Sequence, residues 1–234
     1  MNNKKQCISI ISYITFLGIF TGWAISAYGN QEIYYLAERA QSVTVNKIFS
    51  TSDGQQITFK DINSIDVIYY WLTNVFINSI TFNNSQTSYI TSYNNLLGGI
   101  RIRQLRIQQD TKCAIDPFYQ PIIKNCYAEY SSVIEDKQAF GPNGTYTWSS
   151  ADDLNEMIYN GKNVWYKGSG YAIDIPLNKN IFLNTVNTMR QNSFIDLHTR
   201  ILFIDFNAYN AALNVHLIVR MTFEFLETGG VRPV

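Results

Sequence analysis

One uncharged stretch near the N-terminus constrains this chain more than any other feature. Residues 7–28 read CISIISYITFLGIFTGWAISAY and contain no charged side chain. As an α-helix, a segment of this length spans roughly 33 Å, which matches the hydrocarbon core of a bilayer. Lys4 and Lys5 precede it, and basic residues favour the cytoplasmic side of a membrane. The sequence therefore predicts a cytosolic N-terminus and transmembrane helix over residues 1–28, followed by an extracytosolic domain over residues 29–234.

A cleaved signal peptide is the alternative interpretation of the same stretch. It shares the basic start, the apolar run and the small residues around Ala27 and Gly29. The apolar run is longer than the 7 to 15 residues usual in a signal peptide, which favours the membrane anchor. Both interpretations place the rest of the chain outside the cytosol.

The charge balance argues against a nucleic-acid partner. The chain has 234 residues with 18 basic and 18 acidic side chains, so its formal net charge is zero. Charged residues make up 15% of the chain, below the roughly 25% typical of soluble domains. No basic excess is present to neutralise phosphates, and the length suits one sizeable core beside an anchor.

Hydrophobic periodicity predicts helices early in the domain and an antiparallel sheet later. Helical spacing recurs in residues 31–49, 61–80 and 179–192, and DDLNEMIY after Ser150 is expected to begin another helix. The clearest strand signal lies in residues 215–225, where apolar and polar residues alternate. One predicted face carries Val215, Leu217, Val219, Met221, Phe223 and Phe225. The opposite face carries His216, Ile218, Arg220, Thr222 and Glu224. The expected fold class is α+β.

A second strand is expected in residues 100–109, which read IRIRQLRIQQ. Its apolar alternation changes phase at Gln104, which predicts a bulge or bend there. Arg101, Arg103 and Arg106 on this strand could form an anion-binding patch. On an exposed strand, however, such arginines are usually solvated or paired with acids.

The residues that carry enzyme chemistry do not form a recognisable motif. His198 and His216 stand outside any H-E-x-x-H or C-x-x-C setting, and KGSGY lacks the lysine of a phosphate-binding loop. The adjacent pairs Glu135–Asp136 and Asp152–Asp153 do not guarantee carboxylates that meet across a cleft. We therefore expect no enzyme activity, no metal site and no cofactor.

Two kinds of covalent modification are compatible with an extracytosolic domain. The sequence contains the glycosylation sequons Asn83-Asn84-Ser85 and Asn143-Gly144-Thr145, and GPNGT is turn chemistry that should expose Asn143. Cys113 and Cys126 flank a short loop with two prolines. From spacing alone they could be a metal clip, a reactive pair or a structural disulfide.

Several ordered motifs resemble one protein family. They are LLGGIRIRQLRI, CAIDPFYQPIIKNCYAEYS, EDKQAFGPNGTYTW, SGYAIDIPL, FIDLHTRILFIDFNAYNAALNV and FEFLETGGVRPV. Together they resemble the extracytosolic polycystin domain of the polycystin branch of TRP-type cation channels, over most of residues 95–234. The apolar segment sits where that family has its first transmembrane helix.

The resemblance implies a fold and a role. The fold would be an antiparallel sheet with helices packed on one side and a hairpin lobe stapled by a disulfide between Cys113 and Cys126. Asn143 would carry a glycan. The domain would pack on neighbouring polycystin-type subunits in a homo- or hetero-oligomeric, tetrameric ring that serves assembly and gating. The family further implies contact with membrane lipid and a ciliary or endoplasmic reticulum membrane.

Three functional hypotheses follow. The first is a portion of a polycystin-like cation channel subunit, which we expect not to conduct by itself because the sequence holds a single hydrophobic span. The second is a single-pass or secreted extracellular binding module. The third, a membrane-tethered hydrolase, has no ordered nucleophile, base and oxyanion arrangement to support it.

Overall fold

The computed structural model describes residues 2–28, 31–51, 53–83, 87–91, 93–109, 111, 116, 118, 122, 127–162 and 164–234. The chain divides into two compact units, Met1–Arg39 and Ala40–Val234. The predicted pair Cys113 and Cys126 lies outside the described residues, so the expected disulfide and the lobe around it stay a prediction.

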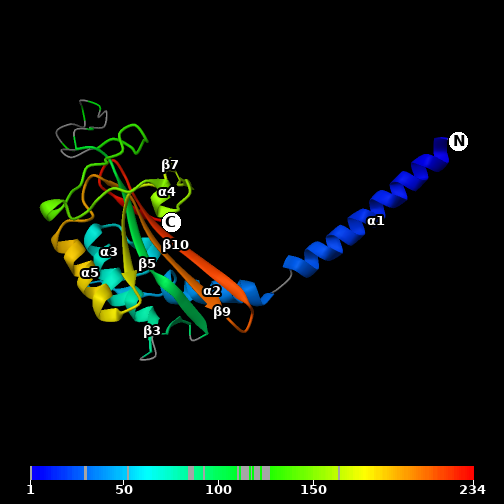
Figure 1. The fold of residues 1–234 in the computed structure, drawn as a ribbon, viewed down its shortest axis with the longest axis horizontal. Coiled ribbons are helices and arrows are strands. Elements are labelled where there is room, and N and C mark those ends of the chain that lie inside the picture. Colours follow the sequence, from blue (N-terminus) through cyan, green and yellow to red (C-terminus); the bar gives the residue numbers. More distant parts are fainter. Residues whose placement is uncertain are drawn as a thin grey trace. The chain divides into compact units, whose positions relative to one another are not determined.

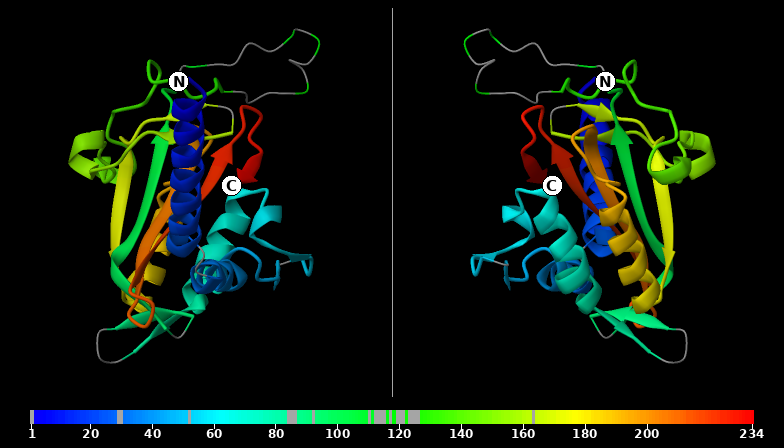
Figure 2. Two further views of the ribbon diagram at one scale, coloured as in Figure 1. Left: turned by 90° about the vertical axis from the view of Figure 1, so that its right-hand side faces the viewer. Right: turned by 90° about the vertical axis from the view of Figure 1, so that its left-hand side faces the viewer.

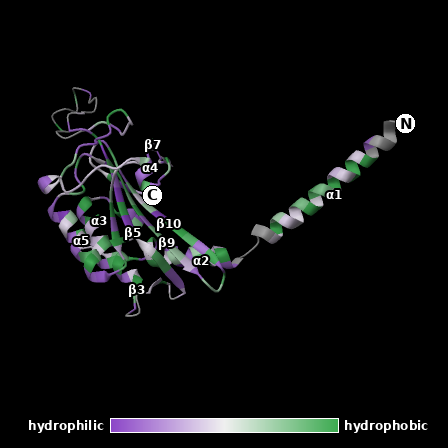
Figure 3. Ribbon diagram, viewed as in Figure 1, coloured by the Kyte–Doolittle hydropathy of each residue, from purple (hydrophilic) through white to green (hydrophobic). Residues whose placement is uncertain are grey.

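The first unit contains the helix α1 (Asn2–Tyr28). Within the described residues, it supplies the single helix that is long and apolar enough to cross a membrane, over Ile8–Ser26. That window has a mean hydropathy of 1.8, and none of it is buried. Figure 3 shows hydrophobic residues along its length. These properties match the predicted membrane anchor.

The second helix, α2 (Gln31–Thr44), begins in the first unit and ends in the second. It confirms the helix predicted from residue 31, but it ends before the predicted end at Phe49. Phe49–Ser50 instead forms strand β1, which pairs with β2 (Gln56–Ile57).

A seven-stranded antiparallel sheet organises the second unit (Figure 1). The strand order is β11-β10-β9-β5-β4-β3, and β8 pairs with β5 beside this path. The strands are β3 (Ile80–Phe82), β4 (Ser88–Ile90), β5 (Asn94–Arg106), β8 (Tyr171–Pro176), β9 (Thr199–Asn210), β10 (Val215–Phe225) and β11 (Val231–Pro233). In Figure 2 the β9–β10 turn lies at the same end of the sheet as β3 and β4, opposite the β10–β11 turn.

Two helical segments cover what we call the inner face of the sheet. The predicted helix at 61–80 is α3 (Ile65–Trp71), a π-helical turn η2 (Leu72–Phe76) and a 3₁₀ turn η3 (Ile77–Ser79). Ser64 caps it by accepting a hydrogen bond from the Val67 N–H. The second is α5 (Lys179–Gln191), capped by Asn178. As its spacing predicted, α5 buries Phe182, Val186 and Met189.

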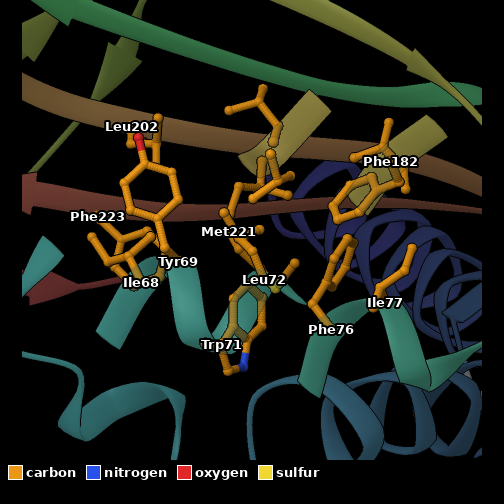
Figure 4. Packing of buried hydrophobic residues seen from close by; sticks show 14 of the residues in the cluster. Ile68, Tyr69, Trp71, Leu72, Phe76, Ile77, Phe182, Leu202, Met221 and Phe223 are labelled. Atoms are coloured by element: carbon orange, nitrogen blue, oxygen red, sulfur yellow. The ribbon is translucent and has the colours of Figure 1, made fainter. Parts of the chain in front are cut away.

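The main core lies between these helices and the inner face (Figure 4). Trp71 and Phe76 have ring centroids 5.2 Å apart, and Phe76 lies 5.8 Å from Phe182. Met221 and Phe223 of β10 meet this layer, and both are buried. Aromatic side chains bury large apolar areas, so this layer supplies much of the packing energy.

The opposite, outer face of the sheet is covered as well, which the sequence interpretation did not foresee. The short helix α4 (Ala151–Leu154) and the ribbon of β6 (Tyr159–Asn160) with β7 (Trp165–Tyr166) belong to the segment that packs there. The 3₁₀ turn η4 (Pro142–Gly144) lies between Phe140 and Tyr146, which pack in the main core. A second apolar cluster forms on the outer face: Leu105, Ile107, Tyr130, Tyr166, Ile201 and Phe203. The expectation that helical elements pack on one side of the sheet therefore holds for α3 and α5 but not for α4.

This second cluster also explains the phase change on β5. The β5–β9 register runs without interruption from Arg101 to Leu105 and shifts between Leu105 and Arg106. The predicted bulge is therefore not at Gln104; the irregularity lies one residue pair further along the strand, after Leu105. Leu105 departs from the phase of Ile102 because it belongs to the outer cluster.

Candidate functional site

The arginines of β5 lie in covered parts of the sheet. Arg101 donates two hydrogen bonds to Asp174, with Nε–Oδ1 and Nη2–Oδ2 distances of 2.6 and 3.0 Å. Arg106 is buried and holds Asp196 through two bonds of 2.8 and 3.0 Å. Arg101 and Arg106 are therefore paired with acids, as the alternative expectation had it, and the suggested anion-binding patch does not form.

Arg103 is the most deeply buried of the three, with 0% exposure. Its Nη1 donates to the carbonyls of Lys167 and Ser169 at 3.2 and 2.8 Å. Its guanidinium carbon lies 4.0 Å from the ring centroid of Phe203, a cation–π geometry. Burial lowers the pKa of Arg103 to about 10. Arg103 thus ties the covering segment to the outer face of the sheet.

Glu135 joins three parts of the covering segment. Its carboxylate accepts hydrogen bonds from the Tyr130 hydroxyl at 3.0 Å, the Trp148 Nε1–H at 2.8 Å and the Ser169 hydroxyl at 2.6 Å. Glu135 is 3% exposed. Sequence reasoning weighed this residue only as one of two adjacent acids. No local signal shows that three distant donors converge on it.

Burial raises the pKa of several tyrosines packed in the two cores. For each of them desolvation of the phenolate is the largest cause. They are Tyr69, Tyr130, Tyr146, Tyr166 and Tyr171. For Tyr130 the nearby charge of Glu135 raises the pKa further.

The outer face of β10 changes from exposed to covered along its length. His216 and Ile218 are exposed, as predicted. Thr222 and Glu224 are buried, so their assignment to a solvent-facing side was wrong. Glu224 accepts a hydrogen bond from the Lys162 N–H at 2.8 Å, because residues 156–166 pack over this half of the strand.

An ion-pair network lies at the point on β10 where the covering segment begins to pack over the outer face. Arg220 donates to Asp205 at 2.7 and 2.8 Å and to Glu156 at 2.6 Å. The side-chain hydrogen bond to Asp205 is the largest cause that raises the pKa of Arg220. These contacts fix the start of the covering segment beside Ile218.

Large apolar side chains are exposed around this boundary. We call the following four residues the outer patch: Met157 (83% exposed), Ile158 (66%), Trp165 (67%) and Ile218 (80%). They lie on the outer face of β10 or on the segment that packs against it. Exposed apolar groups held on rigid elements are typical of surfaces that contact another protein. The outer patch is the candidate functional site.

The remaining predicted site residues lie elsewhere. Asn143 is exposed in η4 with φ 55°, and it confirms the predicted turn. Asn83 is exposed at the end of β3, and its backbone N–H donates to the Thr87 carbonyl. Asp153 forms a capping box with Ser150 at the start of α4. Within the described part of the chain, no group of three or more His, Cys, Asp or Glu side chains could hold a metal ion.

Comparison with known proteins identifies a protein family that the chain matches. The family model described as "Polycystin domain" matches residues 58–234. Polycystin-2 of Danio rerio is 30% identical over 98% of this chain, and Polycystin-2 of Caenorhabditis elegans is 29% identical over 97%. Polycystin-2-like protein 1 of Homo sapiens is 34% identical over 70%. The matched regions span 26%, 32% and 20% of those relatives, respectively.

Proposed function

This chain belongs to the polycystin family, and we propose that it serves a polycystin-type cation channel subunit as a membrane anchor and extracytosolic assembly domain. Residues 1–28 form the cytosolic N-terminus and first transmembrane helix, and residues 29–234 form the extracytosolic domain. The length and apolar character of α1 support the anchor. The family match over residues 58–234 supports the domain assignment.

The observation that carries the assembly role is the outer patch. Four large apolar side chains stay exposed on the outer face of β10 and on the segment that packs against it, although both faces of the sheet carry buried apolar clusters. Subunit contacts would remove these side chains from water, at about 25 cal/mol per Å² of apolar surface buried. The occupant of the patch is a neighbouring polycystin-type subunit in a tetramer. Because α1 and the domain are joined through the chain, such contacts provide a route by which the domain influences gating.

Two modifications belong to the same proposal. A disulfide between Cys113 and Cys126 staples the lobe that they flank, and N-linked glycans occupy Asn143 and Asn83. Both require an oxidising, glycosylating compartment, which agrees with the proposed orientation.

Cross-linking in intact membranes tests the assembly role. The chain is expressed alone or with a full-length polycystin-type subunit and treated with an amine-reactive cross-linker. We expect ladders up to four copies, reduced at least threefold by Ile218→Asp. Ile181→Asp is the matched control, because Ile181 is 45% exposed on α5, away from the outer patch. A chain that stays monomeric under both conditions would contradict the proposal and favour a stand-alone binding module.

A further inference from the structure

A groove runs between α5 and strand β8, on the far side of β5 from β9. It has a volume of about 420 Å³, within the range of small-ligand sites. Three segments line it: Thr145–Thr147, Tyr171–Ile173 of β8, and part of α5 with Phe194. Its base is formed by the buried side chains of Tyr146, Tyr171 and Phe194.

The edge of β8 that borders this groove offers backbone hydrogen-bonding groups. Among the described residues, β8 pairs with β5 and with no second strand. Just before it, Gly170 exchanges two backbone hydrogen bonds with Ser149 on the side away from β5. Backbone groups alternate sides with a period of two, so the N–H and C=O of Ala172 point the same way. Ala172 lines the groove, and its amide is therefore available to an amide-like ligand.

The side chains that line the groove carry no charge. The lining contains four threonines, Thr145, Thr147, Thr185 and Thr188, and Asn184, and the hydroxyls of Thr145 and Thr188 donate to the carbonyls of Pro142 and Asn184 and keep their acceptor capacity. Ile173 and the aromatic base provide apolar contact. Hydroxyl and amide groups around an apolar base, beside a free strand edge, suit a neutral ligand with an acetamido group and several hydroxyls. N-acetylglucosamine has this chemistry.

One of the two sequons of this chain borders the groove. Thr145, the third residue of Asn143-Gly144-Thr145, is part of the lining. Asn143 is two residues away, at most about 7 Å along the backbone. The sugar that joins an N-linked glycan to asparagine is N-acetylglucosamine. We propose that the groove between α5 and β8 holds the first N-acetylglucosamine residues of the glycan on Asn143, with the acetamido group on the Ala172 backbone.

This inference rests on the proposed glycosylation of Asn143, and its test separates the two claims. The full chain is produced in a glycosylating eukaryotic host, purified in detergent and digested natively with peptide-N-glycosidase F. Release at each site is followed by mass spectrometry in ¹⁸O-water. Thr188→Trp fills the mouth of the groove from α5, where Thr188 is exposed. The control is Asn187→Trp, one residue earlier and also exposed but not part of the lining.

We expect Thr188→Trp to speed release at Asn143 at least tenfold and Asn187→Trp to change it less than twofold. Equal release from both variants and the wild type would overturn the groove assignment. A second readout needs no variant: hydrogen exchange of the peptide containing Ala172 should slow at least threefold when the glycan is present. Equal exchange with and without the glycan would also overturn it. Asn143 found without any glycan would instead refute the modification itself.

Discussion

Replacing Glu135 by alanine removes the acceptor shared by three donors on the covered face of the sheet. The Tyr130 and Ser169 side chains are buried, and Trp148 is partly buried. After the substitution all three donors lose their partner. A buried donor left unpaired costs about 1–3 kcal/mol, so Glu135→Ala is expected to destabilise the protein by roughly 3–6 kcal/mol.

Glutamine at the same position gives a graded comparison. Its oxygen can still accept from Trp148 and Ser169, which share Oε1 of Glu135. Its NH₂ group would face the Tyr130 hydroxyl, which must rotate and accept instead of donating. Glu135→Gln loses charge-assisted bonds and leaves one donor, the Tyr130 O–H, without its acceptor, compared with three donors in Glu135→Ala, so we expect a loss of about 1–3 kcal/mol.

Urea denaturation of the full chain in detergent, followed by tryptophan fluorescence, measures these losses in the free energy of unfolding. Glu129→Ala is the control, because Glu129 is exposed in the same segment and its change should stay within about 0.5 kcal/mol. A loss in the free energy of unfolding below about 1 kcal/mol for Glu135→Ala, or a larger loss for Glu135→Gln than for Glu135→Ala, would contradict the proposed role of Glu135.

Three further predictions concern the core, pH and the cysteines. Phe182→Ala should cost about 3–5 kcal/mol in the same assay, because Phe182 is 0% exposed, whereas Ile181→Ala on the exposed side of α5 should cost far less. Above about pH 10 the unfolding free energy should fall, because the five buried tyrosines keep their protons in the folded state after the unfolded chain has lost them. Burial lowers the pKa of Arg103 and Arg200, and these lowered pKa values oppose the fall. Tyr130→Phe removes one titrating tyrosine and should lessen the fall by about 1.4 kcal/mol per pH unit. Non-reducing peptide mapping should recover Cys113 linked to Cys126, and Cys113→Ser and Cys126→Ser should each cost up to about 3 kcal/mol without adding in the double variant. Free thiols at both positions in protein from native membranes, or an unchanged pH slope, would contradict these expectations.

Local periodicity predicted the buried face correctly wherever a helix or strand packs against a single neighbouring layer. The spacing of Phe182, Val186 and Met189 predicts the buried stripe of α5, because a helix on a sheet buries one face. The exposed first half of β10 followed from alternation in the same way.

Periodicity failed where a distant segment covers the second face of a strand. Thr222 and Glu224 have the polar character of a solvent-facing side, yet residues 156–166 bury them. Arg103 looks like a surface residue for the same reason, because its partners are backbone carbonyls more than sixty residues away. Such partners leave no pattern in the strand itself.

Some residues of the outer patch were predictable from the sequence and others were not. The exposed His216 and Ile218 were predictable from alternation on β10. Met157 and Ile158 fall in the helix expected over DDLNEMIY, but that helix ends at Leu154, so their exposure beside the β6–β7 ribbon was not predicted, nor was that of Trp165. The turn at Asn143 was predictable because GPNGT dictates its local backbone.

The central claim is that the extracytosolic domain assembles channel subunits through the outer patch. Counting photobleaching steps of fluorescently tagged chains in intact cell membranes tests it most directly. We expect wild-type chains to form complexes of four copies, alone or completed by polycystin-type subunits, and Ile218→Asp to shift them to single copies. Wild-type chains that bleach in single steps, or an Ile218→Asp variant that still forms complexes of four, would contradict it.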